Sequence, residues 1–143
     1  MFDSVAGVYM PARATRLSRP LIMWRISAGF PSPAEDYVEG RLDLNRDLIK
    51  HPFATFYIRV SGDSMEPRIH GGSLILVDRM VETKDDDIIV ARIGHDLCVK
   101  RLRIETDGAV WLLAENPQYP PIQITEGMDF EVWGRVMNAI DFL

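Results

Sequence analysis

Ser64 and Lys100 are the two side chains of this sequence whose type and placement best suit a chemical reaction. Ser64 follows an alternating, strand-like stretch that ends at Val60, and the turn Ser-Gly-Asp at 61–63 comes directly before it. A serine that leaves a strand through a glycine turn can expose its hydroxyl, while nearby backbone N–H groups can point at one spot, as an oxyanion hole requires. Ser64 is therefore a candidate nucleophile, and a plain polar turn after a strand is the alternative.

Lys100 is the candidate base for that serine. In the run 97–104, strand alternation places Lys100 on one face with Cys98, Leu102 and Ile104, so it is the one charged residue of an apolar stripe. A lysine on an apolar face loses part of the solvation of its charged form, which favours the neutral amine. A neutral amine can take the proton of a serine hydroxyl. The alternative is a lysine that extends its amine to solvent at a strand edge.

The other polar residues predict no further catalytic or metal site. His70 is closer to Ser64 in sequence, but no acidic residue is placed to orient it, so Lys100 is preferred as the base. The three histidines share no ligand spacing and Cys98 has no partner cysteine, so we expect no metal site. A single cysteine also excludes an internal disulfide and fits a reducing compartment.

The elements that must position these residues are mostly strands. Alternation and short apolar runs predict six strands, and the turn signal Asp107-Gly108 predicts a hairpin between the fourth and the fifth. Gly134 predicts a bulge or bend in the last strand. We expect a mostly β domain with a curled, partly barrel-like sheet. The predicted strands are 55–61, 73–78, 88–93, 96–104, 109–114 and 130–140.

A short helical entrance is expected before the strands. The segment SPAE at 32–35 combines a capping serine, a proline suited to the first helical position and a glutamate that completes a capping box. It predicts a helix over 33–41. A second short helix is expected to start at Asp43 and to end by His51, because Pro52 disfavours helical geometry in the residue before it.

Residues 1–28 form a basic arm on an acidic body. The arm carries four arginines against one aspartate, whereas the whole chain has a net charge of −5. It holds Pro11 and Pro20 and shows no sustained periodicity. The acidic balance argues against a general nucleic-acid binder, which needs a basic face to neutralise phosphates. No stretch approaches the roughly 20 apolar residues that span a bilayer, so we expect a cytoplasmic protein.

Several segments, in this order, resemble the self-cleaving domain of the LexA family, and most closely its UmuD branch. The resemblance runs from about residue 27 to the C-terminus, and the order and spacing of the segments together make it specific. The segments are AGFPSPAEDYVEGRLDLN at 28–45, SGDSM at 61–65, LILVD at 74–78, DIIVA at 87–91, VKRL at 99–102 and ENPQYPPIQI at 115–124.

The resemblance implies a fold of the LexA C-terminal domain type and a Ser–Lys peptidase that cuts itself. Ser64 would be the nucleophile and Lys100 the general base. The backbone N–H groups of Asp63 and Ser64 would hold the oxyanion. The scissile bond would join Ala28 to Gly29. The resemblance implies no cofactor.

The resemblance also implies partners. Self-cleavage would remove the arm, residues 1–28, from a domain of residues 29–143 that forms a homodimer. A RecA filament on single-stranded DNA would stimulate the cleavage after DNA damage. The processed dimer would act as the accessory subunit of an error-prone translesion polymerase, with a UmuC-like Y-family subunit. Neither membrane attachment nor direct sequence-specific DNA binding is expected.

Three alternatives remain open at this point. A LexA-type repressor fragment would need an N-terminal helix-turn-helix of roughly 60 or more residues, and the arm is short and interrupted by prolines. A type I signal peptidase shares the Ser–Lys chemistry but should have an N-terminal membrane anchor. An interaction module with an idle dyad differs from a peptidase only in activity.

Overall fold

The computed structural model describes residues 5–10, 18–22 and 38–143. The chain divides into two units, one of residues 12–50 and one that combines residues 1–11 with residues 51–143. The predicted cleavage step Ala28-Gly29 lies outside the described residues. Each unit is described by itself.

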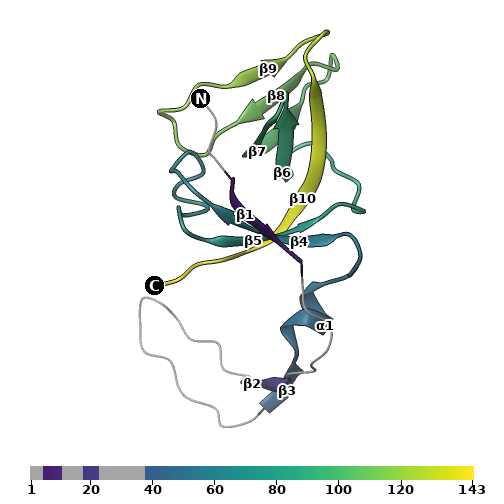
Figure 1. Ribbon diagram of the computed structural model, residues 1–143, viewed down its shortest axis with the longest axis vertical. Coiled ribbons are helices and arrows are strands. Elements are labelled where there is room, and N and C mark those ends of the chain that lie inside the picture. Colours follow the sequence, from purple (N-terminus) through teal and green to yellow (C-terminus); the bar gives the residue numbers. More distant parts are fainter. Residues whose placement is uncertain (1–4, 11–17, 23–37) are drawn as a thin grey trace. The chain divides into compact units, whose positions relative to one another are not determined.

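The smaller unit contains a two-stranded ribbon and one short helix (Figure 1). Strand β2 (Arg19–Ile22) pairs antiparallel with β3 (Val38–Leu42), and α1 (Leu44–Leu48) follows. Asp43 caps the helix, because its side chain accepts hydrogen bonds from the backbone N–H groups of the second and third residues that follow it. The second predicted helix is thereby confirmed, with Asp43 as its cap.

The helix predicted over 33–41 is wrong wherever the structure describes it. Residues 38–41 belong to β3 and pair with β2, while residues 33–37 lie outside the described part of the chain. A capping signal is local, and it does not show that a partner strand is available to take the backbone hydrogen bonds. Gly40 also weakens a helix at this point. Tertiary pairing therefore overrides the local signal.

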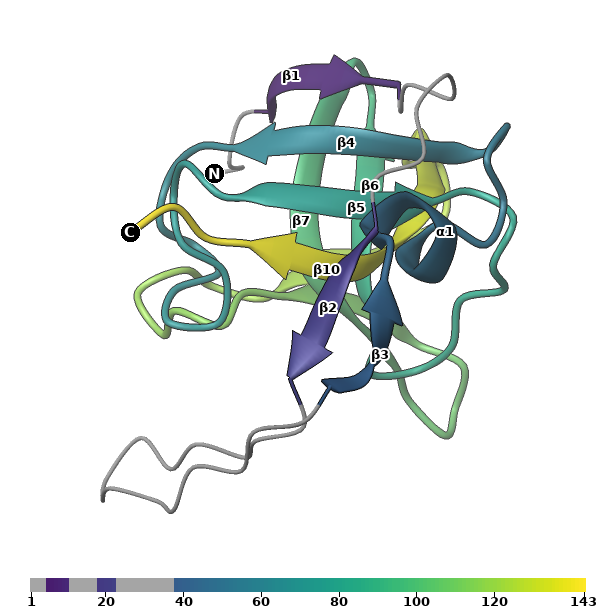
Figure 2. The ribbon, with the colours of Figure 1, turned by 90° about the horizontal axis from the view of Figure 1, so that it is seen from below.

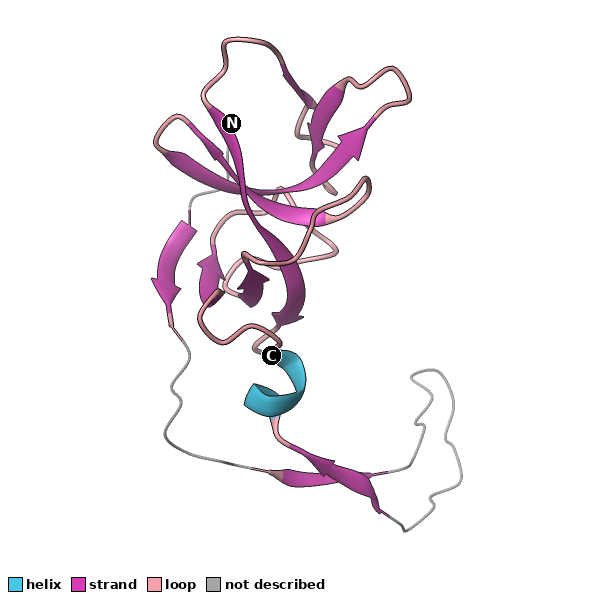
Figure 3. Ribbon diagram, turned by 90° about the vertical axis from the view of Figure 1, so that its right-hand side faces the viewer, coloured by secondary structure: helices cyan, strands magenta, loops and turns pink. Residues whose placement is uncertain are grey.

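The larger unit is built on an eight-stranded antiparallel sheet, drawn as magenta arrows in Figure 3. Its strand order is β1-β4-β5-β10-β6-β7-β8-β9, so β1 and β9 are its two edges. The strands are β1 (Val5–Tyr9), β4 (Thr55–Val60), β5 (Leu74–Asp78), β6 (Ile88–Ile93), β7 (Asp96–Ile104), β8 (Val110–Leu113), β9 (Ile122–Ile124) and β10 (Phe130–Ile140).

Strand β10 joins two halves of this sheet, and Figure 2 shows it beside β5. Its first half pairs with β6 and its second half with β5, and Arg135 pairs with both. The register shifts between Val132 and Gly134, which confirms the predicted irregularity at Gly134. A Cβ at Gly134 would lie 2.6 Å from Cγ1 of Val77, so this close approach requires glycine.

Two hydrophobic clusters form the core of the larger unit. One lies among β4, β5, β6 and β7 and includes Met65 and Ile69 from the connection between β4 and β5. The other is centred on β6, β7 and β8 and includes Cys98, Leu102 and Leu112. The connection that carries Ser64 is therefore anchored in the first cluster by the buried side chains of Met65 and Ile69.

The mostly β fold is confirmed, and each of the six predicted strands is present within one or two residues of its predicted bounds. The predicted hairpin is the pair β7–β8, in which Ile104 lies opposite Val110. The sheet has open edges and is not closed into a barrel. The sequence does not predict strands β1, β2, β3 and β9. Among the described residues, no helix combines the length and the apolar character that a membrane span needs.

Candidate active site

Ser64 lies in a tight connection between β4 and β5, residues 61–73, which we call the serine loop. Backbone hydrogen bonds close its base: the N–H of Gly72 donates to the carbonyl of Val60 at 2.7 Å, and the N–H of Val60 donates to the carbonyl of Ser73 at 2.9 Å. Inside it, the N–H of Glu66 donates to the carbonyl of Asp63 at 3.1 Å, which forms the turn that carries Ser64. Ser64 itself is buried.

Two glycines hold the sides of the serine loop together. Gly62 has a φ of 84°, a left-handed conformation that favours glycine. A Cβ at Gly71 would lie 2.7 Å from the carbonyl oxygen of Gly62, closer than a Cβ approaches a backbone oxygen in proteins. The backbone at Gly71 therefore packs directly against the turn before Ser64, and only hydrogen fits between them.

Lys100 lies at the centre of β7 and is only 2% exposed. It pairs across the sheet with Ile89, and its neighbours on the same face, Cys98 and Leu102, are buried in the second core cluster. The predicted apolar stripe around Lys100 is thereby confirmed. The side chain does not reach solvent at a strand edge. Its Nζ lies 5.3 Å from the centroid of the Tyr119 ring.

One loop between β8 and β9, residues 114–121, connects β7 to the serine loop, and we call it the bridging loop. On the β7 side, Nε of Arg101 donates to the carboxylate of Glu115 at 2.6 Å. On the other side, Asn116 makes two hydrogen bonds to the serine loop, to the carbonyl oxygens of Asp63 and Ser64, at 3.1 Å and 2.9 Å.

Tyr119 completes this connection. Its hydroxyl donates to the carboxylate of Asp63, and its ring faces the amine of Lys100. The bridging loop therefore contacts the residue before Ser64, Ser64 itself and Lys100. Ser64 and Lys100, which are 36 positions apart in the sequence, therefore both contact the bridging loop.

Sequence reasoning assigned no role to Asn116 or Tyr119. In the sequence, the segment ENPQYPPIQI is distinguished only by its resemblance to a family. The available signal was the Asn-Pro dipeptide at 116–117, which favours a turn. This dipeptide predicts the turn in which the N–H of Tyr119 donates to the carbonyl of Asn116 at 3.1 Å. It does not predict which distant residues the turn contacts.

His70 has an acidic partner, contrary to the expectation from the sequence. Its Nδ1 lies 2.7 Å from the carboxylate of Glu66, and its Nε2 lies 3.8 Å from that of Asp141. The helical turn between residues 66 and 70 brings the first pair together, and the end of the chain supplies the second. This hydrogen bond to Glu66, followed by the charge of Glu66, raises the pKa of His70 above its usual value.

We predict that His70 makes the stability of the protein depend on pH. Because the pKa of His70 is raised in the folded state, its contribution is complete below the unfolded value of about 6.5 and is lost as the pH rises through the folded value. The Tm of the wild type should exceed that of His70→Gln at pH 6, and the difference should vanish by pH 9. Thermal melts at both values check this, with the exposed His95→Gln as the matched control. A Tm difference that is the same at both values would contradict it.

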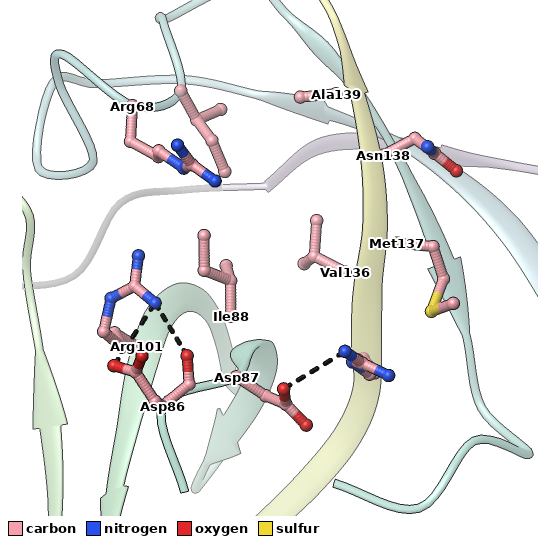
Figure 4. A pocket seen from close by; sticks show the side chains of 11 residues that line it. Arg68, Asp86, Asp87, Ile88, Arg101, Val136, Met137, Asn138 and Ala139 are labelled. Atoms are coloured by element: carbon pink, nitrogen blue, oxygen red, sulfur yellow. Dashed lines mark hydrogen bonds and ion pairs between the residues drawn. The ribbon is translucent and has the colours of Figure 1, made fainter. Parts of the chain in front are cut away.

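A pocket of about 360 Å³ lies beside the serine loop, between Arg68 and the second half of β10. Its lining is charged, and Figure 4 shows Arg101 reaching Asp86. Arg135, which also lines the pocket, pairs with Asp87 at 3.2 Å. Neither Ser64 nor Lys100 lines it. Arg101, which lines this pocket, also binds Glu115 of the bridging loop. It lies on the face of β7 opposite Lys100 and supports the bridging loop from that side.

Within residues 5–10, 18–22 and 38–143, no group of three or more metal-binding side chains could hold an ion. The chemistry that the described residues support rests on a serine hydroxyl, a buried amine and backbone N–H groups. Such a set performs acyl transfer, in which a base activates a hydroxyl nucleophile and N–H donors hold the oxyanion.

Residues 20–137 match the family described as Peptidase S24-like. The chain is 38% identical over 136 residues to Protein MucA of Salmonella typhimurium, covering 93% of this chain and 92% of MucA. It is 43% identical to Protein SamA of the same species, covering 90% of this chain and 89% of SamA.

A third relative is the LexA repressor of Paracidovorax citrulli, which is 39% identical over 127 residues, covering 88% of this chain and 55% of the repressor. The resemblance to the LexA and UmuD family is thereby confirmed. The match spans most of the described sheet, including Ser64 and Lys100. This chain belongs to the S24-like peptidase family.

Proposed function

We propose that this protein is a self-cleaving serine peptidase that uses Ser64 as nucleophile and Lys100 as general base. The backbone N–H groups of Asp63 and Ser64 hold the oxyanion, and the bond between Ala28 and Gly29 is cut. The observation that carries the proposal is the position of the Lys100 amine. It is buried on an apolar strand and faces the tyrosine whose hydroxyl binds the residue before Ser64.

The reaction follows from these groups. The hydroxyl oxygen of Ser64 attacks the carbonyl carbon of Ala28 while its proton moves to the neutral amine of Lys100. The tetrahedral oxyanion is held by the backbone N–H groups. The bond to Gly29 then breaks, and the Lys100 ammonium returns the proton to the new amine of Gly29. Water hydrolyses the ester between Ala28 and Ser64 with Lys100 again as the base.

The proposed cut has a physical consequence for the surface. It separates a basic arm from an acidic body, so the remaining body is more strongly acidic than the intact chain. The step Ala-Gly suits a narrow cleft, because both side chains are small and glycine permits a strained approach. Cleavage therefore changes which charges and which surfaces a partner meets.

We propose that the protein lies in the cytoplasm and acts there in the SOS response. A RecA filament on single-stranded DNA stimulates the cut, and the processed homodimer serves as accessory subunit of an error-prone polymerase with a UmuC-like Y-family subunit. Membership of the S24-like family and the similarity to MucA, SamA and LexA support this proposal.

The proposed role in the SOS response is tested by mixing the full-length chain with a RecA filament formed on single-stranded DNA and ATP. Samples over time are separated by gel electrophoresis. We expect fragments 1–28 and 29–143 to accumulate faster with the filament than without it. Ser64→Ala should stay intact in both mixtures. Cleavage at the same rate with and without the filament would contradict the proposed stimulation but not the proposed peptidase activity.

A further inference from the structure

We infer that Asn116 is a positioning residue for self-cleavage, because it fixes the two peptide groups on either side of the Ser64 Cα. This inference rests on the proposed function of Ser64. Asn116 does not touch the reacting atoms. It sets the direction of the N–H of Ser64, one of the two proposed oxyanion donors.

The geometry is that of a two-point clamp. The side-chain Nδ2 of Asn116 donates to the carbonyl oxygen of Asp63 at 3.1 Å, and its backbone N–H donates to the carbonyl oxygen of Ser64 at 2.9 Å. Two consecutive carbonyl groups are thereby held by one residue. The clamp spans more than 50 residues of sequence, so the serine loop alone cannot supply it.

Planarity of the peptide bond turns this clamp into control of the oxyanion donor. The carbonyl of Asp63 and the N–H of Ser64 belong to one trans peptide group, and they point in opposite directions across its plane. When Asn116 holds the carbonyl oxygen, the N–H of Ser64 is directed away from Asn116. Rotation of this peptide group would change the direction of the Ser64 N–H. The hydrogen bond from Nδ2 of Asn116 to the Asp63 carbonyl opposes that rotation.

Asn116 is itself held in place by its own loop. Its Oδ1 accepts a hydrogen bond from the N–H of Gln118 at 3.0 Å, which leaves Nδ2 directed at Asp63. The neighbouring Glu115 is fixed to Arg101 on β7, and Tyr119 binds the Asp63 carboxylate. Asparagine satisfies both needs, because one amide supplies an acceptor to the turn and a donor to the serine loop.

The test compares Asn116→Ser and Asn116→Asp with the wild type in self-cleavage of the full-length chain at mildly alkaline pH. Either replacement can still accept the bond from Gln118, but neither offers the Nδ2 donor. Misdirected oxyanion donors slow acyl transfer strongly, so we expect the rate to fall by about 10- to 100-fold in both variants. Gln118→Ala is the matched control, because it removes an exposed side chain and keeps the backbone N–H that donates to Asn116.

A structural role is separated from a positioning role by measuring well below the Tm of each variant, with the folded fraction checked by near-UV circular dichroism. In a positioning role, the plateau rate falls in fully folded protein. A rate that matches the wild type once the folded fraction is corrected would overturn the inference. A wild type that does not cut itself at all, with or without the RecA filament, would instead overturn the proposed function and this inference with it.

Discussion

Replacing Lys100 with methionine is expected to slow self-cleavage by about 10²- to 10⁴-fold, the usual contribution of a general base. Lys100 is buried at the centre of β7, between Cys98 and Leu102. Methionine has a similar length and an apolar side chain, so it fits the same space without placing a charge there. The sheet should therefore remain folded while Ser64 loses the group that takes its proton.

The measurement is the rate at which the intact chain disappears, followed by gel electrophoresis, with the Tm as a check of folding. Lys84→Met is the control, because Lys84 is exposed on the same unit and its replacement removes the same charge. We expect this control to cut at the wild-type rate. If Lys100→Met cut as fast as Lys84→Met, Lys100 would not be the base.

Replacing Gly71 with alanine is expected to have the largest effect among the glycine positions near Ser64. The new Cβ would lie 2.7 Å from the carbonyl oxygen of Gly62, and that neighbour is backbone, which cannot rotate away as a side chain does. Overpacking of this kind costs about 1–3 kcal/mol. The displaced atom belongs to the turn before Ser64, so the cleavage rate should fall together with the free energy of unfolding.

Gly108→Ala separates these two effects. Gly108 has a φ of 88° in the turn between β7 and β8, with open space where its Cβ would lie. Alanine there is strained by its backbone alone, so stability should fall by about 1 kcal/mol while cleavage stays at the wild-type rate. Urea unfolding and the cleavage rate of both variants check the prediction. A Gly71→Ala protein that loses stability but cuts normally would show that the turn tolerates the shift.

The sequence predicts the large sheet well because its strands carry local signals. Alternation and short apolar runs mark β4 to β8 and β10, and the turn Asp107-Gly108 marks the hairpin. Strands β1 and β9 are the edges of the sheet and lack such a signal, since an edge strand is held by one neighbour and needs no continuous apolar face. Strand β3 carries a misleading capping signal, and it forms because β2 is available to pair with it.

The site divides in the same way. Lys100 can be found from sequence because alternation makes one charge on an apolar stripe visible before the fold is known. Asn116 cannot be identified from the sequence pattern, because its role depends on two carbonyl groups more than 50 residues away. The acidic partners of His70 were missed for a related reason: Glu66 is one helical turn away inside an irregular loop, and Asp141 is at the other end of the unit.

Self-cleavage by Ser64 and Lys100 is tested by intact-mass spectrometry of the purified full-length protein, incubated for hours at mildly alkaline pH beside Ser64→Ala. Higher pH favours a neutral lysine amine, so a Ser–Lys dyad should cut without a partner. We expect two new masses in the wild type alone, matching residues 1–28 and 29–143. Wild-type protein that stays intact here and with a RecA filament, or a Ser64→Ala protein that is cut at the same bond, would contradict it.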